Sequence, residues 1–385
     1  MKKCLAILLI MITLLSFVTV SADSTQILRL TLEDAQARAL ATNVQYNNQD
    51  GYISDALDDY EDTEEANDEA NERSSRGFLE YFTKPITLDA TLQTAVNNVK
   101  LSRFEKENIK RNSDYNVKKA FINIEKAKYN LEDAKNNVSV KQTDYNTAKL
   151  KLELGYLTEN NLKELELAYK NAVISADAAL KKLQEEVQTL NRYIGREITD
   201  YNIEPVITLT TLDISTIDLD KIREDHISNN KSLYQLSLNA DLTKKKYDQT
   251  KERYDEFVTR KRVENSRKEM EDAYDDATRD YDNARTTFED ATKDLDISLN
   301  STYNSLKTTM DSISNLFKDI EVAKVTAAHN KLMFDQGLMA KNDYEKSEIQ
   351  LKTLQNKLNT SIADLNLMYS SLTMYSDPDT ETAKK

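Results

Sequence analysis

The stretch "LELGYLTENNLKELELAY", residues 152–169, places one of only five glycines of this 385-residue chain between two long helical patterns. A second stretch, "FDQGLMAKNDYEKSEIQL", residues 334–351, repeats the arrangement 182 residues later, so that Gly337 matches Gly155. Glycine takes positive φ at little cost and therefore suits the residue at which a helix stops. Thr158 is a candidate N-cap for a returning helix. Each glycine thus predicts the tip of an antiparallel helical hairpin.

Large apolar residues recur every seven positions in the pattern that precedes each glycine. The first series is Val117, Ile124, Leu131, Val138, Tyr145 and Leu152. An offset of 182 residues carries it onto Leu299, Leu306, Ile313, Ile320, Ala327 and Phe334. A seven-residue recurrence is typical of coiled-coil seams, and the alanines between these positions allow close helix approach. After the glycines, a second pair of series keeps the same offset, which predicts an internal duplication.

The composition favours long helices. Charged residues make up 31% of the chain, there is no tryptophan, and proline occurs only three times, which is unlike a compact α/β enzyme. The formal charge of −14 argues against a nucleic-acid partner. No phosphate loop, nucleophile elbow or metal-binding spacing is present, and His226 and His329 are isolated. We therefore expect no enzyme activity, no cofactor and no metal.

The expected organisation begins with a secretory signal over residues 1–22, where two lysines precede an apolar run that ends at Ala22. The other expected parts follow in order. They are a first helical repeat over 23–200, a linker with a possible short strand over 201–216, a second helical repeat over 217–376 and a C-terminal tail over 377–385.

Within each repeat we expect a short entry helix, a rising helix, a very long descending helix and a returning helix. The entry segments are "LTLEDAQARALATN", residues 30–43, and "LDKIREDHISNN", residues 219–230. Thr31 and Asp34 form a possible capping pair. The first descending helix, from about Leu88 to Leu154, would span roughly 100 Å. In the linker, β-branched residues after Pro205 predict at most one short strand.

These entry segments and hairpin tips resemble the TolC-like outer-membrane efflux protein family, and the resemblance covers nearly the whole mature chain. It implies a homotrimer whose twelve helical strands form an α-helical tunnel, served by an adaptor (membrane fusion) protein and an ABC-type or other pump. The family inserts a pair of β-strands per repeat. Residues 77–87 and 255–266 are too short and too irregular for these strands. The expected fold is therefore all-α, with long antiparallel coiled-coil hairpins in two tandem repeats and little or no β-barrel.

The resemblance also points to an aperture. A family carboxylate six positions after the second glycine lines the closed end of the tunnel, and Asp343 matches it. Asn161 is its equivalent in the first repeat, while Lys346 replaces a second family carboxylate. The alternative interpretation is that Asp343 is only a helix-start acid favoured by the helix dipole. The other site residues are the tip glycines and the seam positions Ile124, Leu131, Val138, Leu306, Ile313 and Ile320.

Two charge runs occupy equivalent rising helices. Residues 55–72 hold ten acids and no base, whereas residues 244–268 hold ten bases against five acids. In a ring in which the halves alternate, an acidic helix would neighbour a basic one and pair with it by complementary charge. The alternative is that both helices present solvated faces that never meet.

The leading functional hypothesis is an exported trimeric duct for passive passage of small molecules or peptides in a tripartite export system. It would lie in the cell envelope, associated with an outer membrane if the cell has one and otherwise in the extracytoplasmic or cell-wall region. The alternative is a non-conducting coiled-coil structural or spacer protein of the envelope.

Overall fold

The computed structural model describes residues 27–73, 78–259 and 264–376. The expected signal peptide and C-terminal tail lie outside these residues. The first repeat contains β1 (Leu28–Thr31), α2 (Leu32–Thr42), α3 (Val44–Glu72), α4 (Phe78–Glu153) and α5 (Glu159–Tyr193). The connection and second repeat contain β2 (Ile203–Val206), the 3-10 turn η2 (Ile214–Thr216), α6 (Leu219–Asn229), α7 (Lys231–Thr259), α8 (Glu264–Asp335) and α9 (Lys341–Leu372).

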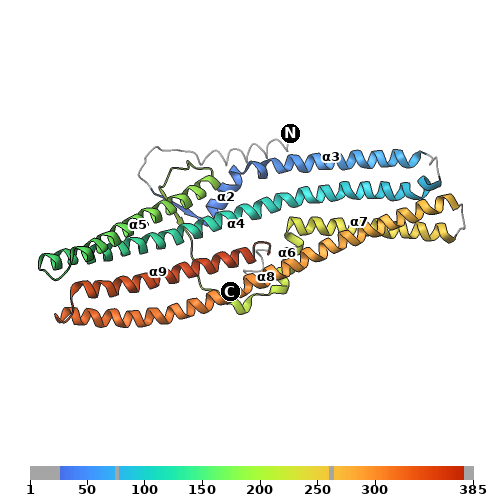
Figure 1. Cartoon of the computed structure of the whole chain (residues 1–385). Helices are drawn as coiled ribbons and strands as arrows, with labels where there is room; N and C mark the ends of the chain where they lie inside the picture. The colour runs from blue at the N-terminus through green and yellow to red at the C-terminus, as the bar shows by residue number, and fades with distance from the viewer. Residues whose placement is uncertain (1–26, 74–77, 260–263, 377–385) are drawn as a thin grey trace.

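The molecule is an elongated rod built on two very long helices (Figure 1). Helix α4 has 76 residues and α8 has 72, which correspond to roughly 114 and 108 Å. Towards one end of the rod α4 packs against α3, and towards the other against α5; α8 packs in the same way against α7 and α9. The prediction of long antiparallel helical hairpins in two tandem repeats is confirmed.

Helix α4 starts ten residues before the predicted Leu88. Proline disfavours a helix interior because it lacks the N–H and crowds the preceding turn, yet Pro85 lies inside α4 near its first end. The described residues at both positions where the resemblance would place strand pairs are helical, up to Thr259 in α7 and from Phe78 in α4. None of the helices in the described part of the chain combines the length and apolar character needed to cross a bilayer.

The two repeats have separate apolar cores. The first joins α2, α4 and α5 around residues such as Val117, Phe121 and Leu190. The second joins α6, α8 and α9 around residues such as Leu306 and Leu365. The seam positions Ile124, Leu131, Leu306, Ile313 and Ile320 are buried, and Val138 is half-buried. Burial of these stripes by the partner helix is what stabilises each hairpin.

A two-stranded parallel sheet connects the start of the chain to the linker. Strands β1 and β2 pair with Leu28 opposite Ile203 and Leu30 opposite Pro205. The strand therefore includes Pro205 and ends at Val206, instead of occupying the β-branched run that follows. Proline is tolerated here because one side of a two-stranded sheet is free. Thr31 then caps α2, with its Oγ1 accepting a 3.2 Å hydrogen bond from the Asp34 backbone N–H.

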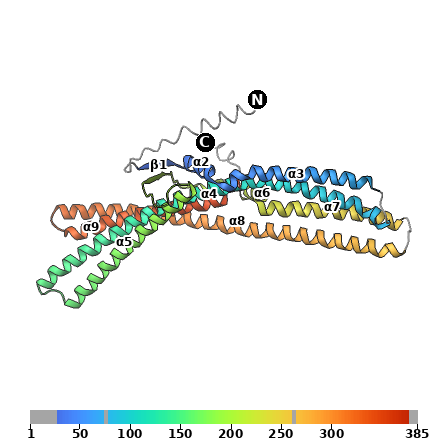
Figure 2. The same ribbon diagram turned by 90° about the horizontal axis from the view of Figure 1, so that it is seen from above.

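The helices pack side by side in a row, which has a fixed order and a free edge on each side. At the tip end the order is α5, α4, α9 and α8, because the contacts run from α5 to α4, from α4 to α9 and from α9 to α8 (Figure 1). At the opposite end it is α3, α4, α7 and α8 (Figure 2). The edge helices are therefore α5 and α8 at the tip end, and α3 and α8 at the other.

Candidate aperture at the hairpin tips

The two tips have the same backbone. Gly155 and Gly337 lie at φ +78° and +73°, two residues beyond the last residues of α4 and α8. At the first tip the Gly155 N–H donates to the Leu152 carbonyl (2.9 Å) and the Tyr156 N–H to the Lys151 carbonyl (2.7 Å). The second tip repeats both bonds, from Gly337 to Phe334 and from Leu338 to Met333, each at 2.8 Å. These paired bonds form a Schellman turn, which satisfies the last helical carbonyls and needs positive φ at the glycine.

The helices that leave the tips begin differently. Thr158 caps α5, and its Oγ1 accepts a 3.3 Å hydrogen bond from the backbone N–H of Asn161. The equivalent cap of α9 is Ala340, which has no side chain able to make this bond. Asn161 and Asp343 are both the third residue of their helix, and both are exposed. At this position the Asp343 carboxylate lies near the positive end of the α9 dipole.

Stacked aromatic rings hold each hairpin together near its tip. Phe334 of α8 stacks on Tyr344 of α9 with 5.4 Å between ring centroids, and Tyr145 stacks on Tyr169 at 6.1 Å. The Tyr344 hydroxyl donates to the Glu348 carboxylate one turn along α9. This bond to an anion raises the pKa of Tyr344 to about 12. Tyr344 therefore stays protonated and neutral at physiological pH.

Polar pairs join the two repeats along the contact between α4 and α9. From the tip inward they are Asp144 with Lys346 at 2.6 Å, Glu132 with Lys352 at 2.7 Å, Asp133 with Asn356 at 2.9 Å, and Lys126 with Asp364. Hydrogen bonding from Lys352 lowers the pKa of Glu132, whereas burial raises the pKa of neighbouring Asp133. Lys346 thus has its own carboxylate partner on α4, separate from Asp343.

The acidic rising helix α3 and the basic rising helix α7 do not pack against each other as a pair within the chain. Helices α3 and α7 each pack on α4, which lies between them (Figure 2). On α7, Lys245 contacts Asp89 of α4 at 3.3 Å, and Lys244 and Lys251 pair with acids of their own helix. The basic helix is therefore internal to the protomer. Within the protomer the acidic and basic helices therefore do not pack as a pair, and their pairing between copies stays a prediction.

Sequence reasoning missed the rows of polar pairs between the repeats. Their members lie beside the apolar seam, where charged residues of coiled coils often pair across helices. Acids on α4 at 132, 133 and 144 and bases on α9 at 346 and 352 carry the signal. The heptad pattern alone does not reveal these polar pairs. Each helix packs against two neighbours, and the apolar series marks the contact with only one of them.

No protein-family model matches this sequence, and a comparison with curated proteins finds no match either. Solved structures do match. The outer membrane protein VceC of Vibrio cholerae aligns with a TM-score of 0.57 at 11% identity, over 89% of this chain and 95% of that one. The Campylobacter jejuni CmeC outer membrane channel gives 0.58 at 12% identity, over 92% and 88%. The Neisseria gonorrhoeae MtrE outer membrane channel gives 0.53 at 12%, over 89% and 88%.

These values define the class of fold. The chain is similar to solved outer-membrane channel proteins over most of its own length and over most of theirs. The TolC-like fold predicted from the entry segments and tips is confirmed. At this level of identity the likeness concerns the fold alone.

Proposed function

We propose that the chain is the protomer of an exported helical duct, in which three copies enclose a tunnel for passive passage of small molecules or peptides. The observation that carries this proposal is the row of four helices with a free edge on each side. A row with two open edges is completed when copies join edge to edge around an axis. Three copies would supply twelve helical strands at each level, as the resemblance implies.

The tips are the proposed gated end of the duct. Both tips present exposed apolar side chains, with Leu154, Tyr156 and Leu338 exposed by 70%, 80% and 65%. Apolar groups gathered on a turn support contact with another protein. We propose that this partner is an adaptor protein of a tripartite system, that a membrane pump supplies the energy, and that the assembly lies in the cell envelope.

Asp343 and Asn161 are the proposed aperture residues. Both begin the helices that leave the tips, and both are free of side-chain partners in the described part of the chain. If tips converge on one axis, three carboxylates of Asp343 form a ring that favours cations. Since Lys346 is paired with Asp144, it does not neutralise this ring within the protomer.

Light scattering on the purified mature protein tests the proposal. We expect a mass three times that of the chain. A rod-like monomer at all protein concentrations would rule out the duct and favour the non-conducting spacer, since one row of four helices encloses nothing. A trimer that fails to pass small solutes in a reconstituted system would also favour the spacer.

A further inference from the structure

The two edges at the tip end carry most of the exposed apolar side chains found on the described helices. Four lie on α5 and four on the tip half of α8, with a fifth, Ile297, near the middle of α8, whereas α9, which is interior to the row, has none. On α5 they are Leu167, Val173, Ile174 and Leu180. On α8 they are Ile297, Phe317, Val322, Val325 and Leu332. Apolar groups of this size concentrated on edge helices indicate a surface that another helix covers.

The spacing of these apolar residues and their distance from the tips show which helix of another copy fits each edge. Leu167 and Ile174 are seven residues apart on α5, and so are Val325 and Leu332 on α8, which is the spacing of a coiled-coil seam. Measured along each helix from its tip glycine, the α5 group lies roughly 18 to 38 Å away and the α8 group from Phe317 to Leu332 roughly 8 to 30 Å. The two groups overlap in height, so the α5 edge of one copy matches the α8 edge of another.

The edges at the opposite end are chemically different. All ten acids of α3 between Asp55 and Glu72 are exposed, and among the described residues only Glu69 has a basic partner, Arg73. No large apolar residue beyond Tyr52 is exposed on α3. Helix α3 packs mainly against α4, so these exposed carboxylates lie outside that contact.

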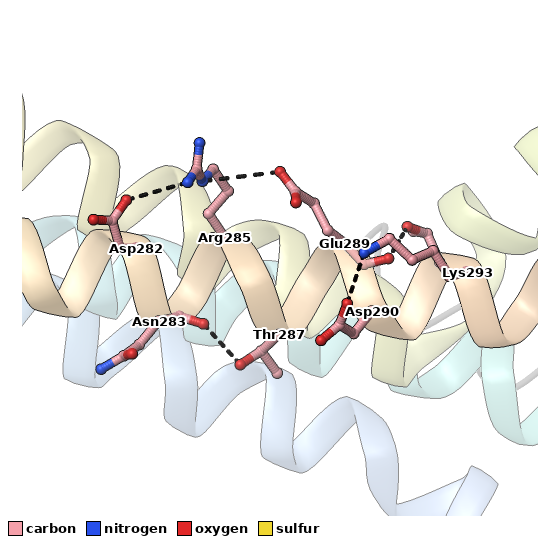
Figure 3. A network of polar contacts seen from close by, with 8 residues as sticks. Asp282, Asn283, Arg285, Thr287, Glu289, Asp290 and Lys293 are labelled. Atoms are coloured by element: carbon pink, nitrogen blue, oxygen red, sulfur yellow. Dashed lines mark hydrogen bonds and ion pairs between the residues drawn. The ribbon is translucent and has the colours of Figure 1, made fainter.

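The part of α8 that forms the other edge at this end is acidic too. Four of its five bases are bound to acids of the same helix, as Figure 3 shows for Arg285, which contacts Asp282 at 3.3 Å and Glu289 at 3.8 Å, and for Lys293 with Asp290 at 2.8 Å. Lys268 is the base without such a pair among the described residues. Asp272, Asp275 and Asp294 have no basic partner in the part of the chain that the structure describes. The first exposed large apolar residue on α8 is Ile297.

We propose that copies of this chain join through the apolar α5 and α8 edges at the tip end, while the α3 and α8 edges at the other end repel. The seam between neighbours is thus closed by packing near the tips and held open by like charge at the far end. Salt screens such exposed charges within about 8 Å at physiological ionic strength and about 3 Å at 1 M. Closure of the far seam therefore depends on ionic strength. The inference rests on the proposed oligomeric duct.

Substitutions at the tip end test the apolar edge. We expect Ile174→Asp and Val325→Asp each to convert the oligomer to monomer in light scattering, with unchanged helical circular dichroism, because both side chains are exposed in the single chain. Val258→Asp on interior helix α7 is the matched control, since Val258 is also exposed but lies far from the tips, and it should leave the mass unchanged. An oligomer that persists in both edge variants overturns the pairing.

Spin labels test the charged seam. The only cysteine, Cys4, lies in the expected signal peptide, so in the mature chain a label at Glu65→Cys on α3 and one at Ala178→Cys on α5 report distances between copies at the two ends. We expect the Glu65 distances to shorten and narrow from 20 mM to 500 mM salt, while the Ala178 distances stay constant. Replacing Asp58, Asp62 and Asp68 by Asn should shorten the Glu65 distances already at 20 mM salt.

The outcomes separate the two levels of the proposal. A monomer at both salt concentrations overturns the duct and the edge pairing together. An oligomer in which Glu65 distances ignore both salt and the Asn substitutions overturns the charged seam alone and leaves the duct standing.

Discussion

At the scale of single residues, the tip glycines have the most clearly defined role. Gly155 and Gly337 adopt positive φ in open space, since an added Cβ would have no neighbour within 4 Å at either position. Any cost of replacing them therefore comes from the backbone alone. Gly51, by contrast, lies inside α3 and does not have a positive φ. An added Cβ would have no neighbour within 4 Å there either.

We expect Gly155→Ala and Gly337→Ala each to lower the free energy of unfolding by about 1 to 2 kcal/mol, because an L side chain in the left-handed region is strained. Gly51→Ala is the control and should raise it by about 0.5 to 1 kcal/mol through helix propensity. Urea unfolding followed by circular dichroism measures all three. A stabilising effect at either tip would contradict the strained turn.

His226 is the second residue with a definite expectation. It is buried, its Nε2 donates to the Leu372 carbonyl at 2.8 Å, and its ring meets Tyr375 edge to face. Burial lowers the pKa of His226, opposed by its hydrogen bond and by nearby Asp225. The folded state thus prefers neutral imidazole, and its contribution is present above the unfolded pKa and lost as pH falls through the folded pKa.

We therefore expect the melting temperature to fall more steeply between pH 7 and pH 5 in the parent than in His226→Gln, which keeps a donor for Leu372 but does not titrate. Carboxylates elsewhere affect both proteins equally, so the difference isolates the histidine. Parallel pH profiles would show that His226 does not contribute to acid sensitivity.

At the scale of elements, the apolar seams decide whether the hairpins form. Ile313 is 1% and Leu131 8% exposed. We expect Leu131→Asp and Ile313→Asp to lower the melting temperature and the oligomer content together, because an unpaired charge in a packed seam costs several kcal/mol. Ser312→Asp, on the exposed side next to Ile313, should change neither. Unchanged circular dichroism melting in both seam variants would refute the seam assignment.

The seams were predictable because burial repeats with the helical period, which is the strongest signal in a sequence. Other features depended on contacts that a single helix does not encode. The start of α4 was missed because the helix continues through Pro85, and the pairing of β1 with β2 joins residues 175 positions apart, such as Leu28 and Ile203. The tip turns were readable from two glycines, whereas the Asp144 and Lys346 pair required knowing that α4 lies beside α9.

At the scale of the whole molecule, Asp343 links the fold to conduction. We expect Asp343→Asn to reduce the cation preference of reconstituted oligomers and to weaken block by multivalent cations, because a ring of carboxylates would be lost. Asn161→Asp is the converse variant and should strengthen both, since Asn161 holds the same helical position. Equal cation preference in all three proteins, or a structure of the oligomer with Asp343 on its outer face, would remove the aperture role.

The separate cores of the two repeats bear on how the chain folds. No residue belongs to both apolar clusters, and the side-chain pairs described between α4 and α9 are made by charged and amide groups. Exposed ion pairs contribute little free energy compared with buried apolar area, so we expect these pairs to couple the repeats only weakly at the tip end. We therefore expect the tip end of one repeat to open while that of the other stays folded. In a ring of copies, one repeat would then be able to open locally during assembly without unfolding of the entire chain.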